Sequence, residues 1–152
     1  MTMLMLAACF GAVQEDRLKA LQDVFDAMEK ALRGGDEAAF KARWSPEGYE
    51  KNLAGKSGLA GKAVFAQGTR KKWFLKPGLA KTRTLGEGAA FIVPCEVWGW
   101  EKERAVDQVE ILLVPEGGRL LVLGGGEKGA EVQALADRFL KKEPLAPPGE
   151  EK

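Results

Sequence analysis

The sequence predicts an α+β domain in which N-terminal helices pack on a curved antiparallel sheet, with one more helix at the C-terminal end. Before Pro77, apolar residues recur with the period of an α-helix. After Pro77 they alternate with a period of two, which is typical of half-buried strands. The chain has 152 residues, of which 45% are hydrophobic and 30% charged, so it can build one domain with its own core.

The first helix is expected over residues 14–33. Its apolar stripe consists of side chains three or four positions apart, namely Leu18, Leu21, Phe25, Met28 and Leu32. Gly34-Gly35 ends this helix, because glycine accepts the left-handed conformation that follows a helix. Asp36 is then placed to cap a second, short helix, which ends at Ser45-Pro46 because proline disfavours the helical conformation in the residue before it.

Residues 47–58 are expected to form a loop, and residues 59–75 a third helix. Gly61 and Gly68 lower the helical propensity of this segment, and Pro77-Gly78 closes it.

Strands are expected over residues 79–85, 89–100, 105–114 and 119–123. In the second of these, an apolar set alternates with a more polar one; the apolar set is Phe91, Val93, Cys95 and Val97. Pro94 has no backbone N–H to donate, so it favours an edge position or a bulge.

The connections and the C-terminal end also carry signals. Residues 101–104 are charged and form the expected turn of a hairpin, and Gly124-Gly125-Gly126 is interpreted as a flexible hinge. A last helix is expected over residues 130–142. The Pro-rich, charged residues 143–152 are expected to be disordered, which leaves residues 14–142 as the folded domain.

This order of elements resembles the NTF2-like (SnoaL-like, cystatin-like cone) superfamily. The stretch from Ala31 to Phe40, with Gly34-Gly35-Asp36 in its middle, looks like the usual turn between the first two helices of that family. The resemblance covers residues 14–124 and implies a cone that holds a small apolar ligand between helices and sheet. The family's first strand, next to the third helix, is not evident here, and the last helix is an addition. The tyrosine and two aspartates of the steroid isomerases have no match.

The absence of histidine excludes several kinds of chemistry. It removes Ser-His-Asp and Cys-His nucleophiles and nearly all zinc sites. We therefore expect no metal and no cofactor. The net charge of +1 and the lack of an RNA-binding motif argue against a nucleic-acid partner. Cys95 lies on the apolar set of its strand and is expected to be a core thiol.

The candidate site is the polar and aromatic face of two predicted strands, formed by Glu96, Trp98, Trp100, Gln108 and Glu110. If this face lines the cone, a desolvated Glu96 or Glu110 could act as acid or base on an apolar carbonyl compound. If it faces solvent, Trp98 and Trp100 suit a partner, such as a second copy of the chain that pairs through the sheet. A non-catalytic binding or interaction domain is the first hypothesis, and a small proton-transfer enzyme is the alternative.

Residues 51–83 carry nine lysines and arginines and no acid. This segment is either a patch for an anionic surface or a solvated face whose charges meet acids elsewhere in the fold.

The first nine residues resemble the lipobox of bacterial lipoproteins, because the apolar Leu6 and the two small residues Ala7-Ala8 precede Cys9. No basic residue comes before Cys9, so this interpretation needs a true start upstream of Met1. Under it, residues 1–13 are a truncated signal segment, and lipid on Cys9 anchors an uncharacterised lipoprotein to the cell envelope. Otherwise the protein is expected to be cytoplasmic.

Overall fold

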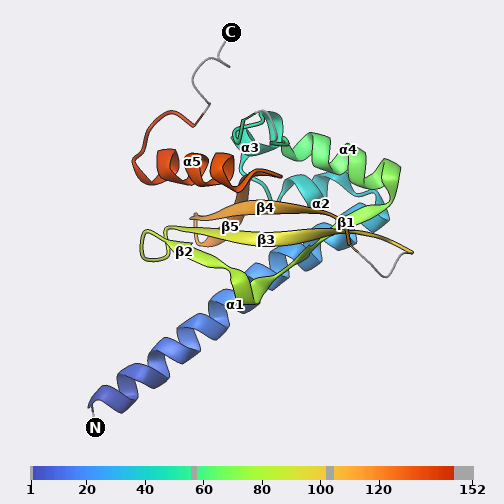
Figure 1. Cartoon of the computed structure of the whole chain (residues 1–152). Helices are drawn as coiled ribbons and strands as arrows, with labels where there is room; N and C mark the ends of the chain where they lie inside the picture. Colours follow the sequence, from blue (N-terminus) through green and yellow to red (C-terminus); the bar gives the residue numbers. More distant parts are fainter. Residues whose placement is uncertain (1, 56–57, 102–104, 146–152) are drawn as a thin grey trace.

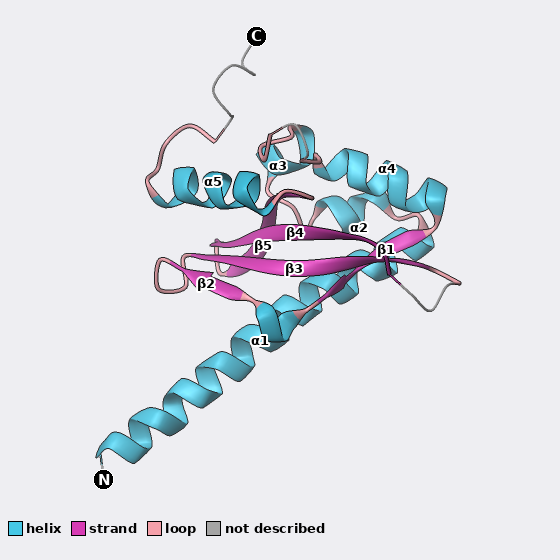
Figure 2. Cartoon of the chain, in the orientation of Figure 1, coloured by secondary structure: helices cyan, strands magenta, loops and turns pink. Residues whose placement is uncertain are grey.

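The computed structural model describes residues 2–55, 58–101 and 105–145, with side chains from residue 16 onward, and it is an α+β fold (Figure 2). The helices are α1 (Thr2–Gly34), α2 (Glu37–Lys41), α3 (Pro46–Glu50), α4 (Gly61–Lys71) and α5 (Gly129–Leu140), with one 3-10 turn, η1 (Leu79–Lys81). The strands are β1 (Trp73–Pro77), β2 (Arg83–Leu85), β3 (Ala90–Gly99), β4 (Ala105–Glu116) and β5 (Arg119–Gly126).

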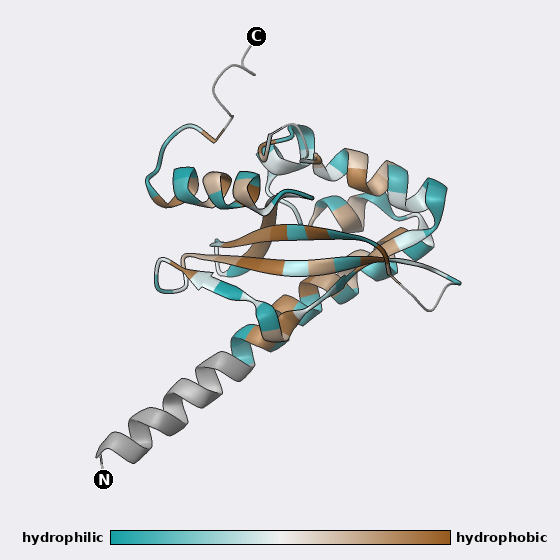
Figure 3. Ribbon diagram, viewed as in Figure 1, coloured by the Kyte–Doolittle hydropathy of each residue, from teal (hydrophilic) through white to brown (hydrophobic). Residues whose placement is uncertain are grey.

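The described strands form one antiparallel sheet, strongly curled, in the order β1-β3-β4-β5, with β2 paired to β3 beyond the end of β1. We call the side covered by α1, α2 and α4 the inner face, and the side covered by α5 the outer face. Figure 1 shows α1 at the N-terminal end and α5 near the C-terminal end of the chain. The expectation of N-terminal helices on a curved antiparallel sheet, followed by a C-terminal helix, is thus confirmed. Apolar residues are concentrated in β3, β4 and β5 (Figure 3).

Two cores, one on each face, hold the layers together. On the inner face, the alternating set of β3 packs against α1 and α4, as its period predicts; this set is Phe91, Val93, Cys95 and Val97. On the outer face, Ile92 and Leu112 are fully buried with Leu135 of α5. The first half of β3 is therefore covered on both faces, whereas the outer face of its second half is not.

The prediction of a helix over residues 59–75 is wrong at its end. Lys72 takes a left-handed conformation, with φ of 55°, and ends α4 there. Trp73 to Pro77 then pair with β3, from Trp73 opposite Gly99 to Pro77 opposite Cys95. A strand beside the third helix, which the sequence did not show, is therefore present.

Close packing explains the two glycines of α4. A Cβ on Gly61 would lie 2.6 Å from Cδ2 of Trp44, and one on Gly68 would lie 2.8 Å from Cδ2 of Leu32. The two positions therefore lower helical propensity but let α4 approach α1 and Trp44 closely.

Three other expectations need correction. Residues 47–58 are not all loop, because Ser45 caps α3: its Oγ accepts a hydrogen bond from the backbone N–H of Gly48 at 3.0 Å. Residues 79–85 are not one strand, because η1 occupies the first part and only β2 is paired. Gly124-Gly125-Gly126 is not a hinge, because all three residues are buried in β5 and pair with β4.

Pro94 lies in an inner strand with no bulge at its position, contrary to the edge or bulge expected. The Pro94 carbonyl accepts a hydrogen bond from the Gly78 N–H at 2.8 Å. Along β3, Pro94 lies between Ile92, which pairs with β2, and Cys95, which pairs with β1. The nitrogen of Pro94 therefore faces the gap between β1 and β2, and no ladder bond is lost. The irregularity of β3 lies between Val97 and Trp98 instead.

The two terminal helices differ from the ranges predicted for them, 14–33 and 130–142. The helix α1 is continuous from Thr2, across the boundary expected at residue 13. At the other end, the chain just after α5 contacts that helix, because the Nε of Arg138 donates a hydrogen bond to the Leu145 carbonyl at 3.1 Å. Residues 146–152 and the turn residues 102–104 lie outside the described residues.

Candidate functional site

A cavity of about 290 Å³ lies on the inner face, between α4 and the sheet. Its walls are mainly apolar side chains from α4 and three strands, among them Val64, Leu75, Val97, Val109 and Ile111. The close-packed interior of a protein leaves few voids larger than a water molecule. This cavity is therefore the strongest candidate for a ligand site in the described part of the chain.

Trp44 forms part of the cavity wall, and the backbone on either side of it is hydrogen-bonded to the edge of β5 that does not pair with β4. The Ser45 N–H donates to the Val122 carbonyl at 2.8 Å, and the Val122 N–H donates to the Arg43 carbonyl at 2.9 Å. The Trp44 side chain is only 3% exposed, and its indole N–H has no hydrogen-bond partner among the described residues. A buried N–H without an acceptor is costly, which makes this group notable in a cavity wall.

The charged groups that line the cavity are all exposed, and they mark its opening. They are Asp107 of β4, Glu127 just after β5, and Lys71 in the last turn of α4. Gly126 pairs with Glu110, so the next residue, Glu127, follows on the face of Val109 and Asp107.

Asp107 and Glu127 interact directly. The carboxylate of Asp107 accepts a hydrogen bond from the Glu127 carboxyl group, and together with the negative charge of Asp107 this raises the pKa of Glu127 above its usual range. Among the described residues, no ion pair within 4 Å involves either carboxylate. The opening thus carries two neighbouring carboxyl groups.

The sequence-predicted acids lie on the other side of the sheet. Glu96 pairs with Gln108, and Glu110 pairs with Pro94, so the three polar side chains share the outer face. They line an open hollow of about 500 Å³ between η1 and the start of α5. The structure brings Glu96, Gln108 and Glu110 together, but none of them lines the inner cavity.

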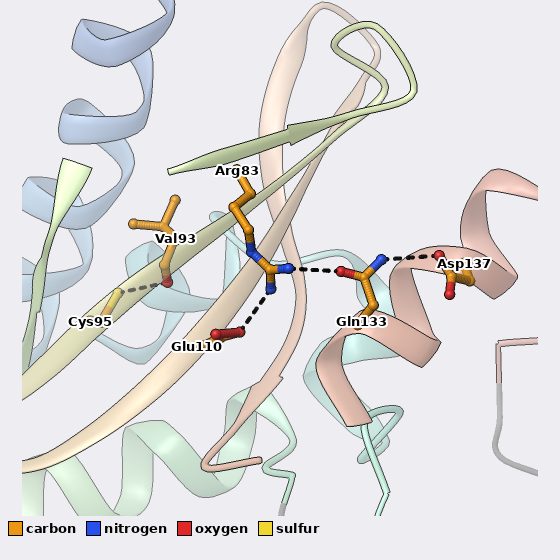
Figure 4. Close-up of polar contacts among 6 residues, drawn as sticks. All are labelled: Arg83, Val93, Cys95, Glu110, Gln133 and Asp137. Carbon is orange, nitrogen blue, oxygen red and sulfur yellow. Dashed lines mark hydrogen bonds and ion pairs between the residues drawn. The ribbon is translucent and has the colours of Figure 1, made fainter. Parts of the chain in front are cut away.

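Glu110 connects the sheet to α5 (Figure 4). Arg83 of β2 donates through Nη2 to Glu110 at 3.2 Å and through Nη1 to Gln133 of α5 at 3.0 Å. A Cβ built on Gly129, the first residue of α5, would lie 3.1 Å from both carboxylate oxygens of Glu110. A negative charge is favourable at the N-terminus of a helix, so Glu110 serves to dock α5.

Trp98 and Trp100 also lie outside the cavity, and cations of the same chain cover them. The Nζ of Lys76 lies 4.1 Å from the ring centroid of Trp98. The Cζ of Arg33 lies 5.8 Å from the Trp100 ring and 5.1 Å from the Phe74 ring. Both tryptophans are half-buried, so each still presents part of its ring to solvent.

Two residues of the basic segment 51–83 form ion pairs with acids. Lys62 lies 3.3 Å from Glu50, and Arg83 forms the ion pair with Glu110. Arg70, Lys71 and Lys72 are exposed where α4 ends, and basic side chains are favourable at that end of a helix.

Cys95 is buried in the inner core, and its thiol donates to the Val93 carbonyl at 3.4 Å. Burial, with a smaller contribution from the charge of Glu110, raises the pKa of the thiol. We expect Cys95 in a Cys9→Ser variant to resist iodoacetamide at pH 8 while folded, because the thiolate is the reactive form. The measurement is mass spectrometry with and without denaturant. Rapid labelling of the native protein would contradict the described burial.

The remaining predicted features concern the membrane and metals. The side chain of Cys9 lies outside the described side chains. Within the described part of the chain, no helix has the length and apolar character needed to cross a bilayer. The described residues also contain no cluster of three or more acids and cysteines placed to hold a metal ion.

Comparison with family models, with curated proteins and with solved structures finds no match to this chain. The site therefore has to be interpreted from its own geometry. Sequence reasoning missed Asp107 and Glu127. Asp107 stands two residues before Val109 and four before Ile111, so strand alternation alone could have placed it on the core side. Glu127 follows three glycines and carries no comparable signal.

Proposed function

We propose that this protein binds a small apolar molecule in the inner cavity and does not transform it. The observation that carries this proposal is an apolar space of about 290 Å³ inside an otherwise buried core, with an opening marked by exposed polar groups. Such a space is close to the lower end of known ligand pockets, which suits a ligand of one ring or a short chain.

The order of the elements supports a relation to the NTF2-like superfamily as part of the same proposal. Helices α1, α2 and α4 cover the inner face, and the cavity lies between α4 and the curled sheet. This is the place where the resemblance predicts a small apolar ligand.

The proposal is tested with 2-phenylethanol as a neutral probe, in a two-dimensional NMR titration of the labelled protein. We expect saturable shifts at Val64, Val109 and Ile111, with little change at Ile92 and Leu112 on the outer face. Shifts restricted to the outer face, or none up to the solubility of the probe, would reject the inner cavity as a binding site.

A proton-transfer enzyme is the second candidate, favoured by the hydrogen-bonded pair of Asp107 and Glu127 at the opening. It predicts accelerated exchange of the α-hydrogens of cyclohexanone in D₂O, and loss of that exchange in Asp107→Asn. If the wild-type protein exchanges these hydrogens no faster than Asp107→Asn, or no faster than buffer alone, the enzymatic candidate is rejected.

Location and partners are part of the proposal as well. We propose that lipid on Cys9 tethers the domain to a bacterial envelope. Expression from the gene with its upstream in-frame sequence should place the protein in the membrane fraction, and Cys9→Ser should release it. The same share of membrane-bound protein with and without Cys9 would reject the anchor.

We also propose a dimer through Trp98 and Trp100. Sedimentation equilibrium should show a dimer that is lost in Trp98→Ala, and a monomeric wild type would reject it.

A further inference from the structure

The charges at the opening of the inner cavity are arranged unevenly. Apart from Asp107, Glu127 and Lys71, no charged side chain lines this cavity among the described residues. Asp107 lies in β4 and Glu127 directly follows the neighbouring strand β5, so the two carboxyl groups lie close together on the cavity side. Lys71 comes from α4 on the opposite wall and forms no ion pair within 4 Å with either of them.

Two adjacent carboxyl groups without a cation are unfavourable when both are ionised. Two carboxylates elsewhere in the described chain show the alternative. Glu110 is neutralised by Arg83 at 3.2 Å, and Glu50 by Lys62 at 3.3 Å. Neither carboxylate at the opening has such a partner among the described residues, and a cationic group of a ligand would supply one.

Trp44 contributes an aromatic surface to the same cavity. It is only 3% exposed and forms part of the cavity wall. Its ring and that of Trp73 give the wall two aromatic surfaces, which suit a flat apolar body or a cation.

We propose that the ligand of the inner cavity is a small apolar amine, whose hydrocarbon body lies against Trp44, Val109 and Ile111 and whose ammonium group binds between Asp107 and Glu127. This inference rests on the proposed function and adds the charge of the ligand to it. A hydrogen bond to a charged group contributes more than one between neutral groups, so the ammonium should favour binding by about tenfold or more.

The test compares three probes that share a phenyl group and a two-carbon arm but differ in charge. They are 2-phenylethylamine, 2-phenylethanol and 3-phenylpropionate, each titrated into the full chain at neutral pH by the same NMR method. We expect the amine to bind at least about tenfold more tightly than the alcohol, and the anion to bind weakest. The advantage of the amine should decrease as salt is added, because the carboxylates are exposed.

Variants separate charge from shape. In the double variant Asp107→Asn, Glu127→Gln, we expect the amine to lose its advantage while the alcohol keeps its affinity. Glu96→Gln, which removes one charge from the outer face, is the matched control and should leave both affinities unchanged.

The outcomes separate this inference from the function on which it rests. If the alcohol binds as tightly as the amine in the wild type, the inference is overturned and the proposed function stands. An amine advantage that survives in the double variant also overturns it, since the two carboxylates are then not its cause. If no probe shifts the cavity residues, the proposed function itself fails.

Discussion

Replacement of Phe40 by alanine is expected to lower the free energy of unfolding by about 3–5 kcal/mol. Phe40 is fully buried, and its ring lies 5.9 Å from that of Trp44 and 5.3 Å from that of Phe65. It therefore joins α2 to the cavity wall and to α4. The truncation leaves a void in that corner, and the surrounding helices can close only part of it.

Urea denaturation followed by circular dichroism measures this loss. A domain of this size has about 5–15 kcal/mol of stability, so the variant should unfold at much lower urea concentration. Phe40→Leu is the control, because it keeps most of the volume and should cost less than half as much. A loss below about 1 kcal/mol for alanine would contradict the described packing of α2.

The fold class could be predicted because the hydrophobic period changes along the chain. The stripe from Leu18 to Leu32 and the alternation from Phe91 to Val97 are properties of local sequence. Both are buried as expected except at Leu18, which is 40% exposed. The strand β1 could not be predicted in the same way. Trp73 and Leu75 extend the apolar pattern of the helix before them, and only the left-handed Lys72 and the pairing with β3 make them a strand. That pairing is a contact between residues far apart in sequence.

Three of the five residues of the candidate site share one face of the sheet, and that face does not hold the cavity. Alternation put Glu96, Gln108 and Glu110 on one side of the sheet, and the structure agrees. Periodicity does not tell which side is hollow, because that depends on how α4 and α5 cover the two faces. Asp107, one of the two acids at the cavity, stands an odd number of positions from Gln108 and Glu110 in its alternation and shares the inner face with Val109 and Ile111.

The three glycines of β5 show a related limit. Glycine-rich segments favour flexibility, and that preference led to the expectation of a hinge. Here the packing requires a small residue. A Cβ on Gly125 would lie 2.5 Å from Cδ1 of Ile111, and one on Gly124 would lie 2.9 Å from a methyl group of Leu135. The absence of side chains lets the helix and sheet layers approach β5, and the strand also forms one end of the cavity.

Replacement of Val109 by phenylalanine is expected to abolish ligand binding while it preserves the fold. Val109 is 9% exposed and stands in the middle of β4, between Asp107 and Ile111 on the inner face. A phenyl ring at this position fills part of the 290 Å³ space. We expect the dissociation constants of 2-phenylethylamine and 2-phenylethanol to rise by at least about tenfold, equivalent to ~1.4 kcal/mol of binding free energy.

The stability of this variant should stay within about 1 kcal/mol of the wild type or increase, because the ring occupies existing space and does not displace packed side chains. Gln108→Phe is the matched control: it makes a similar change one residue away on the outer face and should leave both affinities unaltered. If Val109→Phe unfolds, Val106→Trp tests the same point, because Val106 is 52% exposed at the cavity opening and a larger ring there obstructs entry without entering the core. Undiminished binding in the folded variants would show that the ligand lies elsewhere, because a molecule in this cavity cannot share its volume with an added aromatic ring.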